Sequence, residues 1–196
     1  NIANLLVGDS STPADSGNQQ FFINILQGGS LVAVLESTPI QGGSALLFDS
    51  DINTFYGSVS GVTSNLISGT VSSGQLLGVD LFVAPIPDDA FSAAEISAFG
   101  SFLFGGGSIF FLGENQFFPN QNSHINDALS ALGSGMSISQ DSLVDSGFNT
   151  ASGSRIVPDP YTAGVATFTY AAASQISGGT TLFYGTGLQP FVAYES

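Results

Sequence analysis

The sequence contains no lysine and only one arginine, Arg155, among its 196 residues. With 15 acidic residues, the formal net charge is −14. Binding to nucleic-acid phosphates or to anionic lipid surfaces depends on lysine and arginine, so we expect no nucleic-acid partner and no membrane insertion. The lack of lysine also excludes a Walker-type phosphate loop and catalysis through a lysine Schiff base.

Cysteine is absent as well. Its absence excludes disulfide bonds, thiolate catalysis and metal sites built on cysteine. No apolar run reaches the roughly 18 residues that a membrane-spanning helix needs. The chain opens at Asn1 without a basic stretch, so we interpret this end as processed, with the signal peptide already removed. These features favour a secreted protein of a bacterial cell surface or extracellular matrix.

Charged residues make up only 8% of the chain, whereas 43% of its residues are hydrophobic and 17 are Phe. Such a chain can bury one sizeable core, so we expect a single domain over residues 1–196. Its acidic, lysine-free surface must consist mainly of uncharged polar residues and glycine. Copies of such a surface repel each other weakly, which favours self-assembly into a homopolymer or homo-oligomer.

Apolar runs and helical spacing alternate along the chain and predict the α/β class. Helical spacing predicts three helices. The first covers residues 19–26, the second follows a capping box formed by Ser92 and Glu95, and the third runs from Ser123 to a stop at Gly133. Residues 52–62 fit a short helix or a loop, and irregular excursions are expected near 36–65 and 140–163. Strands are expected over residues 2–7, 31–35, 45–48, 66–71, 80–85, 108–112, 165–170, 180–184 and 190–194.

Residues 80–115 combine an apolar strand, a capped helix, a glycine break and a second apolar strand. This segment resembles the class I glutamine amidotransferase-like superfamily, and residues 159–165 resemble the hPxTxGV element of its non-catalytic branches. The resemblance follows the order of elements over most of the chain. It implies a flavodoxin-like fold, a doubly wound and mainly parallel sheet with helices on both faces. Catalytic members carry a cysteine on the turn after the strand that matches 108–112, so this chain resembles a branch without the nucleophile.

The segment Gly8-Asp9-Ser10 resembles the nucleophile block of SGNH (GDSL) hydrolases, and residues 113–115 resemble their Gly-x-Asn block. Their closing Asp-x-x-His is absent, because the only histidine is His124. A serine nucleophile needs a base within hydrogen-bond reach. If the protein is an enzyme, its catalytic residues are therefore Ser10, Asp9, Glu114 and His124. The alternative is that Asp9 caps a turn, Glu114 is solvated and His124 lies exposed on a helix.

Oxygen-bearing side chains alternate at Asp49, Asp51 and Asn53, as in the first half of a calcium loop. The glycine and the closing glutamate of such a loop are missing, and a helix N-cap is the alternative. No cofactor other than a structural calcium is expected. Aromatic rings at a loop can dock a sugar or a neighbouring subunit, or belong to the core. The predicted ligand-binding residues at the ends of the strands are Asp9, Ser10, Glu114, Asn115, Phe117 and Phe118.

The missing catalytic groups and the nearly uncharged surface favour a non-catalytic extracellular protein, structural or filament-forming, that acts by self-association. One alternative is a secreted SGNH-like hydrolase that uses Ser10. Another is a calcium- or carbohydrate-binding surface module with an extracellular glycan as its partner.

Overall fold

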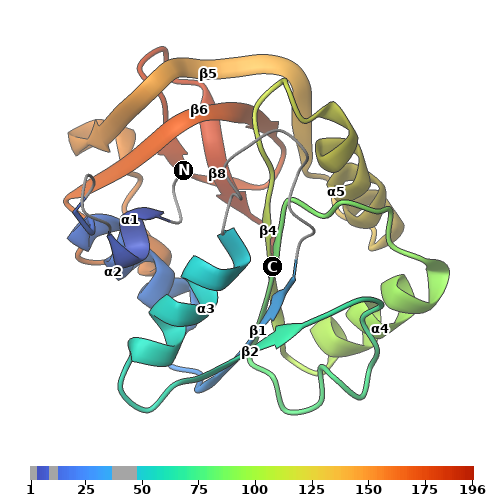
Figure 1. The fold of residues 1–196 in the computed structure, drawn as a ribbon. Coiled ribbons are helices and arrows are strands. Elements are labelled where there is room, and N and C mark those ends of the chain that lie inside the picture. Colours follow the sequence, from blue (N-terminus) through green and yellow to red (C-terminus); the bar gives the residue numbers. More distant parts are fainter. Residues whose placement is uncertain (1–3, 9–12, 37–47) are drawn as a thin grey trace.

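A four-stranded parallel sheet forms the first half of the chain in the computed structural model, which describes residues 4–8, 13–36 and 48–196 (Figure 1). The strand order is β2-β1-β3-β4. Two antiparallel pairs follow, β5 with β6 and β7 with β8, so the chain is a mixed α/β single domain. A flavodoxin-like, doubly wound sheet is not confirmed. The strands are β1 (Leu31–Leu35), β2 (Thr63–Ile67), β3 (Leu81–Pro85), β4 (Ser108–Leu112), β5 (Ser137–Ser152), β6 (Thr167–Ser177), β7 (Thr180–Tyr184) and β8 (Pro190–Tyr194).

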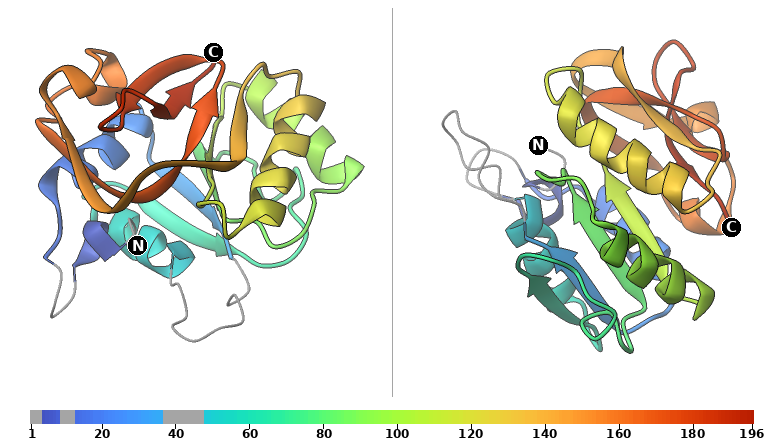
Figure 2. Two further views of the ribbon diagram at one scale, coloured as in Figure 1. Left: turned by 90° about the horizontal axis from the view of Figure 1, so that it is seen from above. Right: turned by 90° about the vertical axis from the view of Figure 1, so that its right-hand side faces the viewer.

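Helices cover both faces of the parallel sheet, because successive side chains of a strand point to opposite faces. Val32 and Val34 of β1 join a core with α2 and α3, and the antiparallel strands cover this same face (Figure 2). Ala33 and Leu35 join a second core with α4. The helices are α1 (Asn4–Val7), α2 (Ser16–Ile25), α3 (Phe48–Ser58), α4 (Ala93–Phe104), α5 (Pro119–Ala131) and the 3-10 turns η1 (Gly153–Arg155) and η2 (Pro160–Thr162). Within the described ranges, no helix has the length and apolarity that crossing a membrane requires.

The N-terminal helix α2 is tied to the C-terminal strands. The ring centroid of Phe21 lies 5.1 Å from that of Phe183 and 5.3 Å from that of Phe168, both edge to face. The fully buried Asn18 donates through Nδ2 to the carbonyl oxygen of Thr169, and its Oδ1 accepts from the amide of the same residue. The two bonds of Asn18 join residues 151 positions apart in the sequence.

Several expected elements are confirmed, among them α2, β1, β3, β4, β7 and β8. The expected capping box opens α4, where the Glu95 amide donates to Ser92 Oγ over 3.3 Å and the Ser92 amide donates to Glu95 Oε2 over 2.8 Å. The helix expected from Ser123 exists, but α5 begins at Pro119. Proline suits the first helical position, because the N–H group of that residue has no acceptor within the helix and its absence removes no hydrogen bond.

Two expectations at the start of the chain are wrong. Residues 4–7 form a helical turn and not a strand, since a short apolar run is compatible with either. The excursion at 36–65 contains the regular helix α3 and most of β2, which begins at Thr63 and not at Leu66. Residues 45–47 of the strand expected at 45–48 lie outside the described residues, and Phe48 begins α3.

The expectation of an irregular segment at 140–163 is also wrong, for a different reason. Residues up to Ser152 belong to the long strand β5, whose register with β6 shifts twice. The second shift surrounds Asp145 and Gly147, which both have positive φ angles, 58° and 68°. Such bulges break the alternation of polar and apolar residues by which a strand is recognised in a sequence.

Candidate functional site

Carboxylates gather where the parallel strands end. Because β1, β3 and β4 are parallel, the residues that follow them lie at one edge of the sheet, the edge at which open α/β sheets bind ligands. Helix α3 leads from β1 back to β2, so its first turn lies at the same edge. We call this region the acidic edge, and its carboxylates are Glu36, Asp49, Asp51, Asp88, Asp89 and Glu114.

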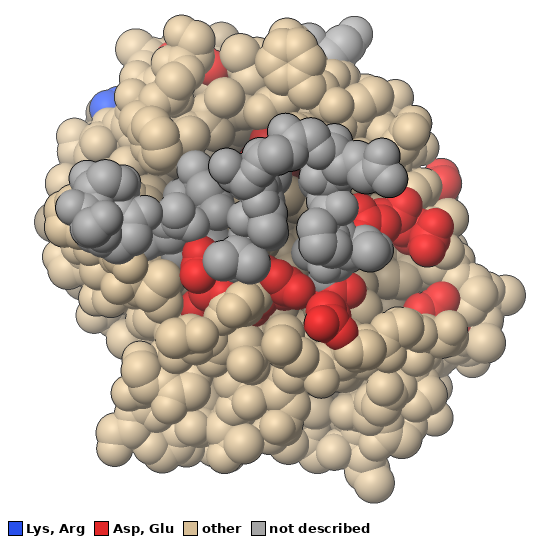
Figure 3. All heavy atoms as spheres, viewed as in Figure 1, with Lys and Arg blue, Asp and Glu red and all other residues tan. Residues whose placement is uncertain are grey.

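No lysine or arginine lies among these carboxylates. The chain has no lysine, and its one arginine lies in η1, where the guanidinium of Arg155 donates to the carbonyl oxygen of Thr150 in β5. Figure 3 shows Asp and Glu side chains in a band across one face of the molecule. A group of carboxylates without a nearby lysine or arginine produces a negative potential that attracts cationic ligands.

The turn after β4 is held in place by a buried asparagine, Asn122 of α5, which is 0% exposed. The Glu114 amide donates to Asn122 Oδ1 over 2.9 Å, and Asn122 Nδ2 donates to the Glu114 carbonyl over 2.7 Å. Ser174 of β6 donates to the same carbonyl over 2.7 Å. A Cβ atom on Gly113 would lie 2.7 Å from Asn122 Oδ1, so only glycine allows this approach. The turn is therefore a fixed part of the fold.

The carboxylate of Glu114 is engaged within this turn. Its Oε2 accepts from the backbone amide of Asn115 over 2.8 Å and from Asn115 Nδ2 over 2.7 Å. Burial raises the pKa of the Glu114 carboxyl, and the hydrogen bond from the Asn115 amide opposes part of that rise. Asn115 Oδ1 in turn accepts from the amide of Phe117 over 2.9 Å. The side chains of Glu114 and Asn115 thus shape the loop.

His124 connects α5 to the loop after β3. Its Nδ1 lies 3.0 Å from the carbonyl oxygen of Pro87. A carbonyl oxygen only accepts, so Nδ1 carries the proton and, in the neutral ring, Nε2 remains as an acceptor. The half-buried His124 thus joins two of the loops that form the acidic edge.

The structure brings four of the predicted ligand-binding residues together in the loop after β4. Phe117 is 79% exposed, whereas Phe118 is half-buried at the start of α5. The predicted residues Asp9 and Ser10 lie outside the described residues, so the predicted catalytic group stays a prediction. The residues of the loop are Glu114, Asn115, Phe117 and Phe118.

The predicted calcium ligands Asp49, Asp51 and Asn53 lie on helix α3 and not in a loop. Side chains two residues apart on a helix point to different sides, so this spacing does not direct the three toward one ion. Within residues 4–8, 13–36 and 48–196, no three His, Asp or Glu residues lie close enough to hold a metal ion. The first turn of the helix is where acidic side chains are favourable, because they face the positive end of the helix dipole.

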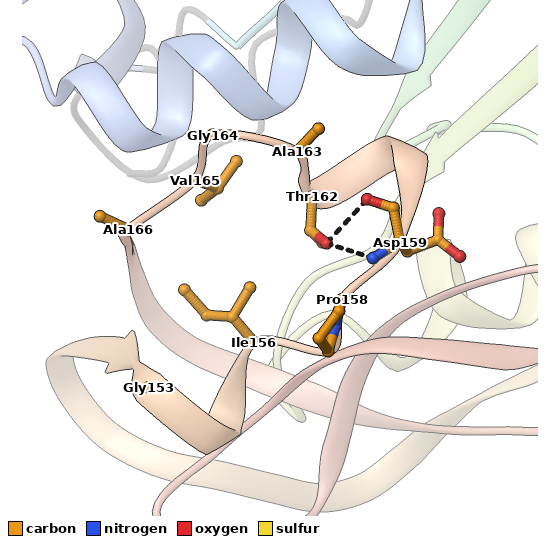
Figure 4. Close-up of a pocket in the computed structure, with 9 residues that line it drawn as sticks. All are labelled: Gly153, Ile156, Pro158, Asp159, Thr162, Ala163, Gly164, Val165 and Ala166. Atoms are coloured by element: carbon orange, nitrogen blue, oxygen red, sulfur yellow. Dashed lines mark hydrogen bonds between the residues drawn. The ribbon is translucent and has the colours of Figure 1, made fainter.

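A hollow of about 430 Å³ lies between η1 and η2, and none of the acidic-edge residues lines it (Figure 4). Its polar lining residues bond to each other, since the Asp159 amide lies 3.0 Å from Thr162 Oγ1. Asp159 Oδ2 also accepts from the hydroxyl of Tyr194 over 3.1 Å. Ligand pockets need polar groups that are available to orient the ligand. This hollow therefore has few of the features of a small-molecule site.

The sequence analysis missed Asn122. A signal was present, because Asn122, Ile125 and Leu129 are spaced by three and four residues and so share one face of α5. A polar residue on the apolar face of a helix is buried with it and needs hydrogen-bond partners. The partners themselves, on the β4 turn and on β6, are not visible in the sequence.

Comparison with known proteins gives a structural likeness only. No family model and no curated protein sequence matches the chain. Among solved structures, the mmIFT52 N-terminal domain superposes with a TM-score of 0.53 at 21% sequence identity, over 68% of this chain and 70% of that chain. This level of identity shows a shared fold and nothing further.

The likeness corrects several predictions. The assignments to the glutamine amidotransferase-like superfamily and to the SGNH hydrolases are wrong, because neither family is indicated and the second half of the chain forms antiparallel strands. The prediction of a secreted matrix, cell-surface or filament protein is corrected as well, because the solved structure that matches is an IFT52 N-terminal domain and not a protein of that kind. The extracellular localisation, which depended on that prediction, is withdrawn with it.

Proposed function

We propose that this chain is a non-catalytic protein-binding domain that joins a multi-protein assembly through its acidic edge and needs no cofactor. The observation that carries the proposal is the set of six carboxylates at the ends of the parallel strands, of which Asp49 is buried, with no lysine or arginine among them. Such a surface favours a partner with a basic segment, because complementary charge speeds the encounter and disfavours acidic competitors.

The fold supports this choice of surface. The strand order β2-β1-β3-β4, with helices on both faces, fits the first four strands of a flavodoxin-like sheet. Sheets of that kind bind their ligands at the carboxyl ends of the strands, between the two strands where the winding reverses. Here those strands are β1 and β3. The structural neighbour belongs to an intraflagellar transport protein, which is a component of a protein complex.

The groups with catalytic potential at this edge are used to hold loops, which supports a binding role. Glu114 bonds to Asn115, and the protonated nitrogen of His124 bonds to Pro87. Both groups therefore have a role in the structure of the loops, which favours binding over catalysis. Self-association and glycan binding, the other predicted modes, stay untested predictions.

The proposal is tested by affinity capture from the cells in which the protein occurs, at low salt, with quantitative mass spectrometry. The variant is Asp89→Asn, an exposed carboxylate of the acidic edge. The matched control is Asp127→Asn, an exposed carboxylate further along α5 with the same change of charge.

We expect a defined set of proteins to be captured by the wild type and the Asp127→Asn variant and to be depleted with Asp89→Asn. Raising the salt from 50 to 300 mM should weaken the same capture, because surface charges are screened beyond about 6 Å at the higher ionic strength. Capture that is identical for all three proteins, or insensitive to salt, would contradict the acidic edge as the binding surface.

A further inference from the structure

We propose that the outer edge of β2 binds an extended, basic segment of a partner protein, which adds a strand to the parallel sheet. The inference rests on the proposed function and specifies how the partner is held. Strand addition of this kind uses backbone hydrogen bonds for affinity and side-chain contacts for specificity.

The outer side of the β2 backbone carries hydrogen-bonding groups that have no strand partner among the described residues. Strand β2 is at the end of the sheet, and the register with β1 is regular over all five residues. The Thr63 amide donates to Ser30 and the Ile67 carbonyl accepts from Glu36, so alternate residues of β2 face β1. The intervening residues, Ser64 and Leu66, direct their N–H and C=O groups outward. No other strand of the described part of the chain pairs with this side.

The edge lacks the features by which proteins usually prevent strand addition. Edge strands are commonly protected by lysine or other charged residues, by proline or by a bulge. The five residues Thr63–Ile67 include no charged residue and no proline, and the register has no shift. Leu66 is 42% exposed, which offers a partner strand an apolar contact on the α3 face of the sheet. An unprotected edge of this kind is consistent with a binding surface.

Charge indicates what kind of segment fits. The carboxyl end of β2 reaches the acidic edge, where the hydroxyl of Ser68 donates to the exposed carboxylate of Glu36. A strand added to β2 would lie two strand spacings from β1, or about 10 Å, which is within the range of electrostatic attraction at 0.1 M salt. A basic residue at that end of the partner would face Glu36. A second copy of this chain has no lysine to place near Glu36, and its one arginine lies in η1 and not on a free extended segment.

The test uses a fluorescent peptide, Thr-Val-Thr-Val-Thr-Lys-Lys, and the same residues in reverse order, so that the lysines can meet Glu36 in either strand orientation. The control peptides carry glutamate in place of lysine, or proline in place of valine. The protein variants are Leu66→Lys on the edge and Leu77→Lys in the loop before β3, where Leu77 is 83% exposed. Both variants change the net charge equally, so a difference between them reports on position. Circular dichroism checks that both are folded.

We expect one lysine peptide to bind the wild type and Leu77→Lys equally and to bind Leu66→Lys at least tenfold more weakly. Neither control peptide should bind. In hydrogen–deuterium exchange of the free wild type, the amides of Ser64 and Leu66 should exchange fast and those of Asn65 and Ile67 slowly. The peptide should slow exchange at Ser64 and Leu66 alone, and this measurement needs no variant.

Three results would overturn the inference. The first is protection of Ser64 and Leu66 in the free monomer, and the second is equal peptide binding by Leu66→Lys and Leu77→Lys. The third is protection that grows with protein concentration as a dimer forms, which would make a second copy the occupant. If any of these occurs while capture still depends on Asp89, the strand inference fails and the proposed function stands. If the dependence on Asp89 is also absent, both fail.

Discussion

Replacing Asn122 with alanine should destabilise the protein strongly, because this side chain forms the link between the β4 turn, α5 and the antiparallel strands. The substitution removes the bonds to the amide and carbonyl of Glu114 and weaker contacts, 3.2 Å to Ser174 Oγ and 3.3 Å to the Ser139 carbonyl. The Glu114 carbonyl keeps its bond from Ser174, but the Glu114 amide is left without a partner. Two or three lost hydrogen bonds at about 1 kcal/mol each, with an orphaned amide at a further 1–3 kcal/mol, give a loss of about 3–6 kcal/mol.

The measurement is urea unfolding followed by circular dichroism, with the thermal midpoint as a second readout. A loss of this size should lower the midpoint by roughly 10 °C in a chain of this length. The control is Asn120→Ala, the same substitution at an exposed position of α5, which should change the free energy of unfolding by no more than about 0.5 kcal/mol.

A third variant, Asn122→Asp, separates hydrogen bonding from packing. Its carboxylate preserves the side-chain shape but faces the carbonyl oxygens of Glu114 and Ser139 without a proton to donate. It should therefore be destabilised at neutral pH and regain stability in acid, as protonation restores a donor. A loss below about 1 kcal/mol for Asn122→Ala, or no pH dependence for Asn122→Asp, would refute the assigned role of this residue.

Three further predictions concern titration and catalysis. Burial raises the pKa of Glu114 in the folded state, so the stability that the protonated carboxyl contributes is fully present below the unfolded-state pKa and is lost as the pH rises through the folded-state pKa. Glu114→Gln should therefore stabilise the protein at neutral pH and lose that gain in acid. Urea unfolding across pH 3–8 measures this difference. Backbone hydrogen bonds from Ser30 and Leu31 lower the pKa of Asp80 in the folded state. The stability that its carboxylate contributes is therefore present above the unfolded-state pKa and is lost as the pH falls through the folded-state pKa. In thermal melts at neutral pH, Asp80→Ala should be less stable than the wild type by about 1 kcal/mol. The value is small because the site is exposed. The difference should vanish at a pH at which Asp80 is protonated. The wild type and His124→Gln should hydrolyse p-nitrophenyl acetate equally slowly, and a rate that depends on His124 would contradict the non-catalytic proposal.

Local rules predicted the elements whose structure is decided locally. The capping box of α4 is an example, because Ser92 and Glu95 satisfy each other's amides whatever surrounds them. The continuous apolar runs of β3 and β4 likewise indicate strands of a parallel sheet with both faces covered. These two strands and the helix between them also placed Glu114 and Asn115 correctly in the loop after β4.

The sequence could not predict features that depend on distant contacts. The four residues of α1 have no local signal that separates a helical turn from a strand, and β5 is interrupted by bulges whose partners lie on β6. The role of Asn122 depends on Ser174, which is 52 residues away. The extracellular assignment was inferred from low charge and absent cysteine, and composition of that kind does not determine where a protein works.

The bond between Asn18 and Thr169 has a consequence for the way the chain folds. During synthesis, the apolar face of α2 leaves the ribosome long before the aromatic rings of β6 and β7 that cover it. Phe21 therefore stays exposed until residues near the other end of the chain have been synthesised. Contacts of such long sequence separation slow folding, because the entropy of closing the loop is lost before any contact energy is gained. We therefore expect the emerging chain to depend on chaperones until β7 and β8 are complete, and truncations that remove these strands to aggregate.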